Sequence, residues 1–572
     1  YLKKYKKEYI LGIFYIFLAN VFFTISPRIL KHTIDSIKQG ISSRKLLYYA
    51  FALVGVAILH LIFRFLMRYT VIGASRKIEY DMRNDFFSHL LTLPNSFYNK
   101  YKTGDLMARA TNDLNAVRNV LGPGIMHGIG NSMLFVLVVT LMMITDVKLT
   151  LLALIPLPFI SVAAKFSMKL IFKTFKQAQA QYSTITAKAQ ENIAGMRVVK
   201  AYVQETNESA EFDQLSQKYL DLNLKLTRIQ AILFSSLTFL MGIGTIILIW
   251  YGGHLVVGDV IEIGDFIAFT VWLGMLAWPM ISFGWIMNMI QQGAASMERL
   301  MEIMDIEPHI RDDERTDKSI QDFSGEIEFK NVSFSYGDNL PIVLENINIK
   351  IQAGQTIAIT GPTGSGKTTL VNLIPRLMEA SEGQVLIDGV DVRKIPLNML
   401  RKHIGVVPQE TFLFSESISN NISFGLQNAA FEEIEKAASI STIRSDLEDF
   451  SERYETLVGE RGITLSGGQK QRTALSRAII RKPRILILDD ALSSVDSHTE
   501  EKILRQFSEF NSRNTCIIIS QRISTIKNAD VIYVLKEGKV IESGTHEDLL
   551  KSNGFYTELY KKQLLEKVLE KM

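Results

Sequence analysis

Eight consecutive residues past the middle of the chain have the types and spacing needed to hold phosphate groups. They occupy positions 361–368 and read Gly-Pro-Thr-Gly-Ser-Gly-Lys-Thr. The glycines let backbone N–H groups approach phosphate oxygens, Lys367 adds a positive charge, and the Thr368 hydroxyl can bind Mg²⁺. The segment therefore predicts binding of ATP or GTP with Mg²⁺. The predicted nucleotide contacts here are Gly361, Pro362, Thr363, Gly364, Ser365, Gly366, Lys367, Thr368 and Thr369.

The residues on either side of this loop have the patterns that such a loop requires. Apolar residues 356–360 predict a strand before it, and residues 369–377 predict a helix after it, so that the helix amino terminus faces the phosphates. From residue 325 onward, short apolar strands alternate with helical segments, which is typical of a mixed α/β domain. The other expected strands include 327–329, 384–388, 485–488, 515–520 and 531–535.

Two further motifs follow the loop in the sequence. Residues 465–469 read Leu-Ser-Gly-Gly-Gln. Residues 485–489 are an apolar strand that ends in Asp489, and the next residue is Asp490.

The first half of the chain contains six uncharged stretches. A helix needs about 20 apolar residues to cross a bilayer, and most of these stretches reach or approach that length. A soluble helical core is the alternative, but soluble helices rarely repeat such uncharged lengths. The pattern predicts a multi-pass protein of the cell membrane, surrounded by lipids. The stretches are residues 9–26, 46–63, 122–145, 149–164, 229–257 and 266–297.

Charge and cysteine content narrow the possibilities further. Lys3, Lys4, Lys6 and Lys7 precede the first stretch and predict a cytosolic amino terminus, with the first helix kept as an uncleaved anchor. The segment between the first two stretches is also basic, so the rule is not cleanly obeyed there. The net charge of +4 is small beside 63 basic and 59 acidic residues, which argues against a nucleic-acid partner. A single cysteine, Cys516, excludes an internal disulfide.

Two segments between the membrane stretches are too long for ordinary loops. Residues 73–121 and 165–228 are charged but rich in helix formers, so we expect membrane helices that continue into the cytosol and fold back. Disordered loops are the alternative, although residues 173–202 keep apolar residues at helical spacing. We expect a six-helix membrane domain at 1–307, a linker at 308–324, and a cytosolic nucleotide-binding domain at 325–572.

With these motifs in place, the carboxy-terminal half resembles the nucleotide-binding domain of an ATP-binding cassette (ABC) transporter. The whole chain is similar to a bacterial exporter half-transporter with its membrane domain first. The resemblance implies that Tyr336 stacks on adenine, that Gln409 and Asp489 contact Mg²⁺, and that segments 456–462 and 494–496 belong to family loops. It also implies a signature that contacts nucleotide across a dimer interface, formed by Leu465, Ser466, Gly467, Gly468 and Gln469.

The tips of the two cytosolic extensions fit the same resemblance. Residues 103–113 resemble the first coupling element of such exporters, and residues 191–202 lie in the region of the second. A short helix across each tip would transmit movement of a nucleotide-binding domain to the membrane helices. A solvated amphipathic helix is the alternative for either segment.

Two positions depart from the family pattern. Asp490 stands where an active cassette carries Glu, and Gln521 stands where it carries a switch histidine. These changes predict a site that holds ATP and hydrolyses it slowly, inside a heterodimer whose other subunit supplies Glu and His. A homodimer with two slow sites and an ATP-sensing regulatory subunit without transport are the alternatives.

The transported compound is less well defined by the sequence. The last membrane stretch is rich in aromatic and thioether side chains, which suit an amphipathic drug, lipid or peptide. Packing within the bundle or against lipid explains the same residues equally well. His60, Arg64 and His127 are candidates for polar groups in a cavity, although His60 and Arg64 lie close enough to one end of their stretch to reach lipid headgroups. The aromatic and thioether residues are Trp272, Met275, Trp278, Met280, Phe283, Trp285, Met287 and Met289.

Overall fold

A computed structural model describes the chain except for residues 338–339, 427, 460–464, 511–513 and 570–572 and the side chains of 507–510 and 566–569. The chain divides into two compact units, which are described separately. One holds Tyr1–Leu91 and Thr103–Ile306, and the other holds Thr92–Lys102 and Glu307–Met572.

The first unit is entirely helical, and six spans in it are long and apolar enough to cross a membrane. Several spans join consecutive helices through π-helical turns, as in 103–145. The expected multi-pass bundle is confirmed. The spans are Lys6–Lys38 (α1), Ser43–Leu90 (α2), Thr103–Thr145 (α4, η1, α5, η2 and α6), Val147–Ala194 (α7 and α8), Glu205–Val257 (α10, η3 and α11) and Ile263–Met304 (α12).

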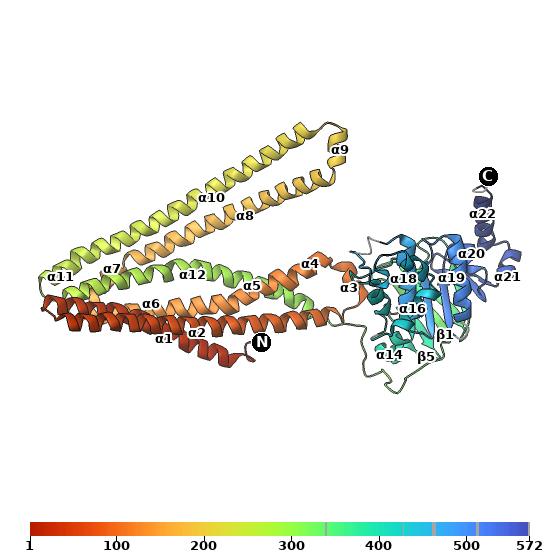
Figure 1. Ribbon diagram of the computed structural model, residues 1–572, viewed down its shortest axis with the longest axis horizontal. Helices are drawn as coiled ribbons and strands as arrows, with labels where there is room; N and C mark the ends of the chain where they lie inside the picture. The colour runs from red at the N-terminus through yellow and green to blue at the C-terminus, as the bar shows by residue number, and fades with distance from the viewer. Residues whose placement is uncertain (338–339, 427, 460–464, 511–513, 570–572) are drawn as a thin grey trace. The chain divides into compact units, whose positions relative to one another are not determined.

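The long segments between the spans are helical, as expected, and are held by polar contacts along their length. Helices α8 (Pro156–Ala194) and α10 (Glu205–Ile247) run side by side to α9 (Met196–Ala201), as Figure 1 shows. Lys188 bridges these two helices through a 2.6 Å ion pair with Glu208. On the other extension, Arg299 of α12 donates to buried Asp113 of η1 (Arg109–Asp113) at 3.0 Å. Such pairs fix helices where no membrane surrounds them.

The coupling elements predicted from the sequence take different local forms. Residues 191–202 include the short helix α9, which agrees with the expected shape. Residues 103–113 instead begin the long span through α4 (Thr103–Ala108) and η1. The short helix is α3 (Asn95–Lys100), which follows Pro94 and buries Phe97. Because proline breaks the preceding helix, the turn falls about one segment earlier than predicted.

The second unit contains two sheets with helices around them. The smaller sheet is antiparallel, in the order β2-β1-β4-β5, and the larger is mainly parallel, in the order β10-β9-β3-β8-β7-β6. The strands are Ile327–Ser335 (β1), Ile342–Ile351 (β2), Thr356–Thr360 (β3), Glu382–Ile387 (β4), Val390–Asp391 (β5), Ile404–Val407 (β6), Ile485–Asp489 (β7), Thr515–Ile519 (β8), Val531–Lys536 (β9) and Lys539–Gly544 (β10).

Alternating side chains on the central strands fill two separate hydrophobic cores. Ile485 and Ile487 of β7 enter the core shared with the smaller sheet, whereas Leu486 and Leu488 enter the core under the helices. A parallel sheet covered on both faces needs such continuous apolar strands. Besides α3, the helices of this unit are Lys367–Asn372 (α13), Leu397–Lys402 (α14), Ile418–Ser423 (α15), Phe431–Ile440 (α16), Arg444–Glu448 (α17), Gly467–Ile479 (α18), Ser497–Phe510 (α19), Ile523–Ile526 (α20), His546–Lys551 (α21) and Phe555–Leu569 (α22).

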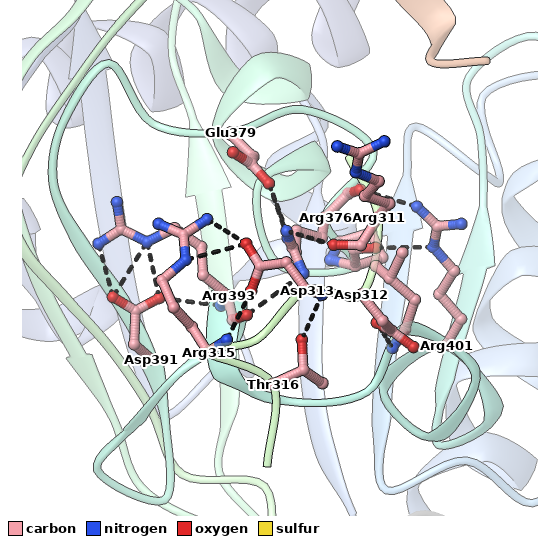
Figure 2. A network of polar contacts seen from close by, with 12 residues as sticks. Arg311, Asp312, Asp313, Arg315, Thr316, Arg376, Glu379, Asp391, Arg393 and Arg401 are labelled. Carbon is pink, nitrogen blue, oxygen red and sulfur yellow. Dashed lines mark hydrogen bonds and ion pairs between the residues drawn. The ribbon is translucent and has the colours of Figure 1, made fainter. Parts of the chain in front are cut away.

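The polar segment predicted to be a linker is fastened to the second unit by a network of charges (Figure 2). Buried Arg376 donates to Glu379 at 2.8 Å and to the Arg311 carbonyl at 3.4 Å. The Asp312 carboxylate accepts the Leu397 amide at 2.9 Å. Residues 311–317 therefore form an ordered strap on this unit.

Candidate functional site

The phosphate loop lies between β3 and α13, and its glycines are required by the backbone. Gly361, Gly364 and Gly366 have φ angles of 144°, 79° and 95°, which L side chains rarely adopt. A Cβ on Gly361 would also lie 1.9 Å from the Leu535 carbonyl oxygen. Helix α13 ends at Asn372, so the predicted helix to residue 377 is too long.

Lys367 is folded back over the loop. Its Nζ donates to the carbonyls of Gly361 at 2.9 Å and Pro362 at 2.7 Å, and more weakly to Ser365 at 3.4 Å. Burial lowers the pKa of Lys367, while the charges of Asp489 and Asp490 oppose this effect. The ammonium group is thus held ready for an anion by neutral carbonyls that a phosphate can replace.

The order of the parallel strands brings the remaining predicted groups to the same edge. Strand β8 lies between β3 and β7, so the carboxyl ends of all three meet. Gly361 follows β3, Asp490 follows β7, and Gln521 lies shortly after β8. Ligand sites of open α/β sheets form at such an edge.

Asp489, the last residue of β7, and Asp490, the residue after it, have different surroundings. Asp489 is buried, and this burial raises its pKa; the Thr368 hydroxyl donates to it and lowers the pKa, while the Asp490 charge raises it. Asp490 has a φ of 48° and its amide donates to the Ile519 carbonyl at 3.0 Å. Burial also raises the pKa of Asp490, against the charges of Arg522 and Lys367.

These groups line one cavity of about 390 Å³. Gln521 reaches across it, because its Nε2 lies 3.3 Å from Thr363 Oγ1. Tyr336 borders it, with its hydroxyl 2.9 Å from Thr369 Oγ1 and its ring packed edge-on against Phe334. Gly361, Pro362 and Ser365 shape the loop but do not line the cavity. The predicted residues that line it are Tyr336, Thr363, Gly364, Gly366, Lys367, Thr368, Thr369, Gln409, Asp489, Asp490 and Gln521.

The donor set of the cavity fits a magnesium nucleotide. Thr368, Gln409 and Asp489 present oxygen atoms, which Mg²⁺ prefers, and Mg²⁺ takes its other ligands from water and phosphate. Among the residues that the structure describes, no group of three or more His, Cys, Asp or Glu could hold a metal without such help. The residues therefore suit a metal that arrives with a phosphate chain.

The signature, residues 465–469, does not line this cavity and lies at the start of α18, which begins at Gly467. Ser466 caps the helix, and Ser466 and Gln469 exchange side-chain and backbone hydrogen bonds at 3.3 and 3.0 Å. Cβ atoms on Gly467 or Gly468 would contact Ser494 at 3.2 and 3.0 Å. The predicted loop 456–462 falls partly outside the described residues, since 460–464 are not described.

Gln563 of α22 is a candidate site residue that the sequence analysis missed. Its Nε2 donates to the Gln521 carbonyl at 2.6 Å, and its Oε1 accepts the Ile523 amide at 2.9 Å. One side chain thus holds the backbone on both sides of Arg522. No motif in the sequence marks this residue, because it lies on a helix 42 positions after its partner.

The membrane unit contains a larger cavity of about 790 Å³ between α1, α2, α6 and α12. Of the predicted candidates, His60, Arg64, His127, Met275 and Trp278 line it. Trp272 does not, because it is buried in the bundle and donates to the Thr24 carbonyl at 3.3 Å. Trp285 and Met289 line a separate cavity of about 400 Å³.

Comparison with known families accounts for both units. The model of the ABC transporter transmembrane region matches residues 9–280, and the ABC transporter model matches residues 344–493. The chain belongs to the ABC transporter family. This ABC transporter is a multi-pass membrane protein of the exporter type, with an ATPase domain after six apolar spans.

Several relatives match nearly the whole ABC transporter chain. The probable multidrug resistance ABC transporter YheI of Bacillus subtilis is 35% identical over 99% of this chain and 97% of its own. The multidrug resistance-like protein MdlA of Escherichia coli is 31% identical over 100% and 96%. The ATP-dependent lipid A-core flippase of Syntrophus aciditrophicus is 37% identical over 86% and 81%. A bacterial Atm1-family ABC exporter with ATP bound has a similar structure, with a TM-score of 0.78 and 25% identity over 98% of each chain.

Proposed function

We propose that this chain is one half of a heterodimeric ABC exporter of amphipathic compounds, and that its own ATP site turns over slowly. The printed names of its relatives include multidrug resistance and lipid flippase proteins, which supports a drug or lipid as the transported class. The observation that carries the proposal is the joint position of Asp490 and Gln521 on the wall of a cavity whose phosphate loop is complete.

In this proposal, Asp490 is a weaker catalytic base than the Glu that active cassettes carry at the same position. It is one methylene shorter than Glu, so its carboxylate stays farther from a water placed to attack the terminal phosphate. A displacement of about 1 Å can cost about 100-fold in rate. Loss of general-base assistance typically costs about 10²- to 10⁴-fold.

Gln521 keeps one part of the switch function and loses another. Its amide lies at the phosphate loop beside Thr363, so it can donate a hydrogen bond to a terminal phosphate. An amide carries no charge, whereas a histidine can become cationic. ATP therefore binds here, with Lys367 and the loop amides on its phosphates and Tyr336 beside its base, but its cleavage is slow.

The complete signature serves the other site in this proposal. When two cassettes pair head to tail, the signature of each chain closes over the nucleotide of the other. Residues 465–469 do not line this chain's cavity, which is consistent with a role across the interface. The partner then provides the faster base, and ATP binding at both sites favours the outward-facing state.

The decisive experiment measures ATP turnover by the purified chain alone and by the complex obtained after coexpression with a neighbouring half-transporter gene. We expect negligible phosphate release from the chain alone and full activity from the complex. Replacing the partner's catalytic Glu with Gln should abolish both phosphate release and dye transport into vesicles. Rapid phosphate release from a preparation that contains this chain and nothing else would contradict the proposal.

A further inference from the structure

The cavity in the membrane unit has an unusual balance of charges. Arg64 and Arg68 of α2 line it together with His60 and His127. No aspartate or glutamate occurs among the described residues around it. Its other walls are largely apolar and include Phe23, Met275 and Trp278. A compound inside the cavity therefore contacts both cationic and apolar side chains.

The two arginines lie just after the uncharged stretch 46–63 of α2, level with residues 12–19 of the uncharged stretch of α1. Helices α1 and α2 are antiparallel neighbours, because His60 Nδ1 contacts the Ala19 carbonyl at 2.9 Å and Lys4 pairs with Asp81 at 2.7 Å farther along. At about 1.5 Å per residue, Arg68 lies about 20 Å along α2 from Asp81. Arg64 lies about 6 Å beyond Arg68, one turn away on the same face.

The structure records no hydrogen bond or ion pair for either arginine within the part of the chain that it describes. Other polar residues of the cavity are already engaged. Asn20 donates to the Gly130 carbonyl at 2.9 Å, and Asn131 donates to Ser282 at 2.6 Å. Charged residues beside membrane-spanning stretches usually face a partner, the headgroup region or a substrate path. Arg64 and Arg68 are exposed in this chain, so they are the charged groups of the cavity that are open to a ligand.

The guanidinium groups of Arg64 and Arg68 determine which kind of ligand the cavity favours. They stay charged at all ordinary pH values, and their planar donors bind carboxylate or phosphate oxygens in pairs. A cationic compound would be repelled by both groups. A neutral compound would leave them without a partner.

We propose that this cavity binds an amphipathic anion, with its carboxylate or phosphate between Arg64 and Arg68 and its apolar part against Phe23, Met275 and Trp278. The assignment rests on the proposed export function and names the substrate class of the exporter. It is independent of which ATP site hydrolyses, because it concerns binding before any nucleotide is added.

The test is a fluorescence titration of the purified complex in phosphatidylcholine nanodiscs without nucleotide. The probes are 11-(dansylamino)undecanoic acid and its uncharged methyl ester, which differ only at the head group. Because only the acid can form a charge-assisted hydrogen bond with a guanidinium group, we expect it to bind about tenfold tighter or more than the ester. Equal affinities of acid and ester would overturn the proposal.

Substitutions then locate the preference. Arg64→Gln with Arg68→Gln should remove it and leave the affinity for the ester unchanged, which also shows that the cavity is intact. Arg64→Lys with Arg68→Lys should keep part of it. Arg44→Gln with Lys45→Gln is the matched control, because it removes two charges from the same helix outside the cavity and should have no effect. An unchanged preference in the double Gln variant would refute the assignment.

Competition distinguishes an amphiphile from a simple anion. Dodecyl phosphate should displace the bound acid, whereas inorganic phosphate at the same concentration should not. Equal displacement by both would contradict the amphipathic part of the proposal. Rapid ATP turnover by the isolated chain, with the acid preference retained, would refute the slow ATP site and leave this cavity assignment standing.

Discussion

The nucleotide cavity and the membrane cavity of this exporter are built in opposite ways. The nucleotide cavity forms where adjacent strands end, and residues of the phosphate loop and the start of α13 make up part of its wall. Its cation, Lys367, has Asp489 and Asp490 nearby. The membrane cavity is lined by side chains from four helices. No Asp or Glu accompanies its arginines among the described residues that line the cavity. The phosphate loop contains glycines whose backbone conformation tolerates few substitutions. The side chains that line the membrane cavity can be substituted to suit different ligands.

The largest expected effect restores chemistry to the nucleotide cavity. Asp490→Glu combined with Gln521→His should raise ATP turnover of the isolated chain by about 10²- to 10⁴-fold, since it returns a longer base and a chargeable donor. Phosphate release per mole of protein measures this gain. Adding Lys367→Ala should abolish it. No gain in the double variant would show that these two positions do not limit hydrolysis.

A second prediction compares glycines that line the two cavities or lie near them. Gly361→Ala should lower ATP affinity by about 100-fold, because the new Cβ meets the Leu535 carbonyl and must displace the loop. Gly274→Ala should leave folding and ligand binding unchanged, because no atom lies within 4 Å of its Cβ position in the membrane cavity. A fluorescent ATP analogue and the dansyl acid report the two affinities.

The matched control for Gly361 is Gly389, which also has a positive φ of 78° but meets no atom within 4 Å. Gly389→Ala should cost about 1–2 kcal/mol of stability from backbone strain alone and keep ATP affinity. Equal losses of ATP affinity at Gly361 and Gly389 would mean that strain, rather than the close contact, governs the loop.

A smaller effect is expected at Gln563, which holds the backbone beside Gln521. Gln563→Ala should speed the release of ATP from this site by up to about tenfold, because two hydrogen bonds that fix the segment are lost. Release of radiolabelled ATP from the complex measures the rate. Gln563→Glu keeps the acceptor for the Ile523 amide and should have an intermediate effect. Equal rates of ATP release from the unsubstituted protein, Gln563→Ala and Gln563→Glu would show that Gln563 contributes only to packing.

The smallest effect concerns pH. Because the pKa of Asp489 is raised, the folded protein holds the Asp489 proton more tightly than the unfolded chain does. Protonation of Asp489 therefore contributes to the free energy of unfolding. This contribution is full below the ordinary pKa of 3.8 and is lost as the pH rises through the raised pKa. Asp489→Asn should therefore stabilise the nucleotide-free protein by about 1 kcal/mol or less at pH 7.5, and less at acidic pH. Thermal unfolding in detergent measures the change. Mg²⁺ with ATP should reverse its sign, whereas a gain constant across pH would contradict this account.

The sequence was sufficient wherever backbone conformation and a short motif determine structure. Residues 361–368 predicted the loop, and the apolar segments 356–360 and 485–489 predicted the strands that place it beside Asp489. The six spans and their helical extensions followed from length and charge.

The sequence was not sufficient to predict features that depend on packing between distant segments. Gln563 acts through a contact that no local pattern encodes. Arg68 was not singled out, since only the packing of four helices shows that it shares a cavity wall with Arg64. The turn at Pro94 placed a short helix before the predicted coupling segment. The roles of the site residues, the dimer and the domain limits remain predictions.

The strap at residues 311–317 has a mechanical consequence. Helix α12 ends at Met304, and the strap begins at residue 311. With the strap fastened through Arg376 and Asp312, the six residues 305–310 form the tether between the helix and the strap. Fully extended, a tether of this length spans roughly 20–25 Å, which sets an upper limit on how far the end of α12 can separate from the strap.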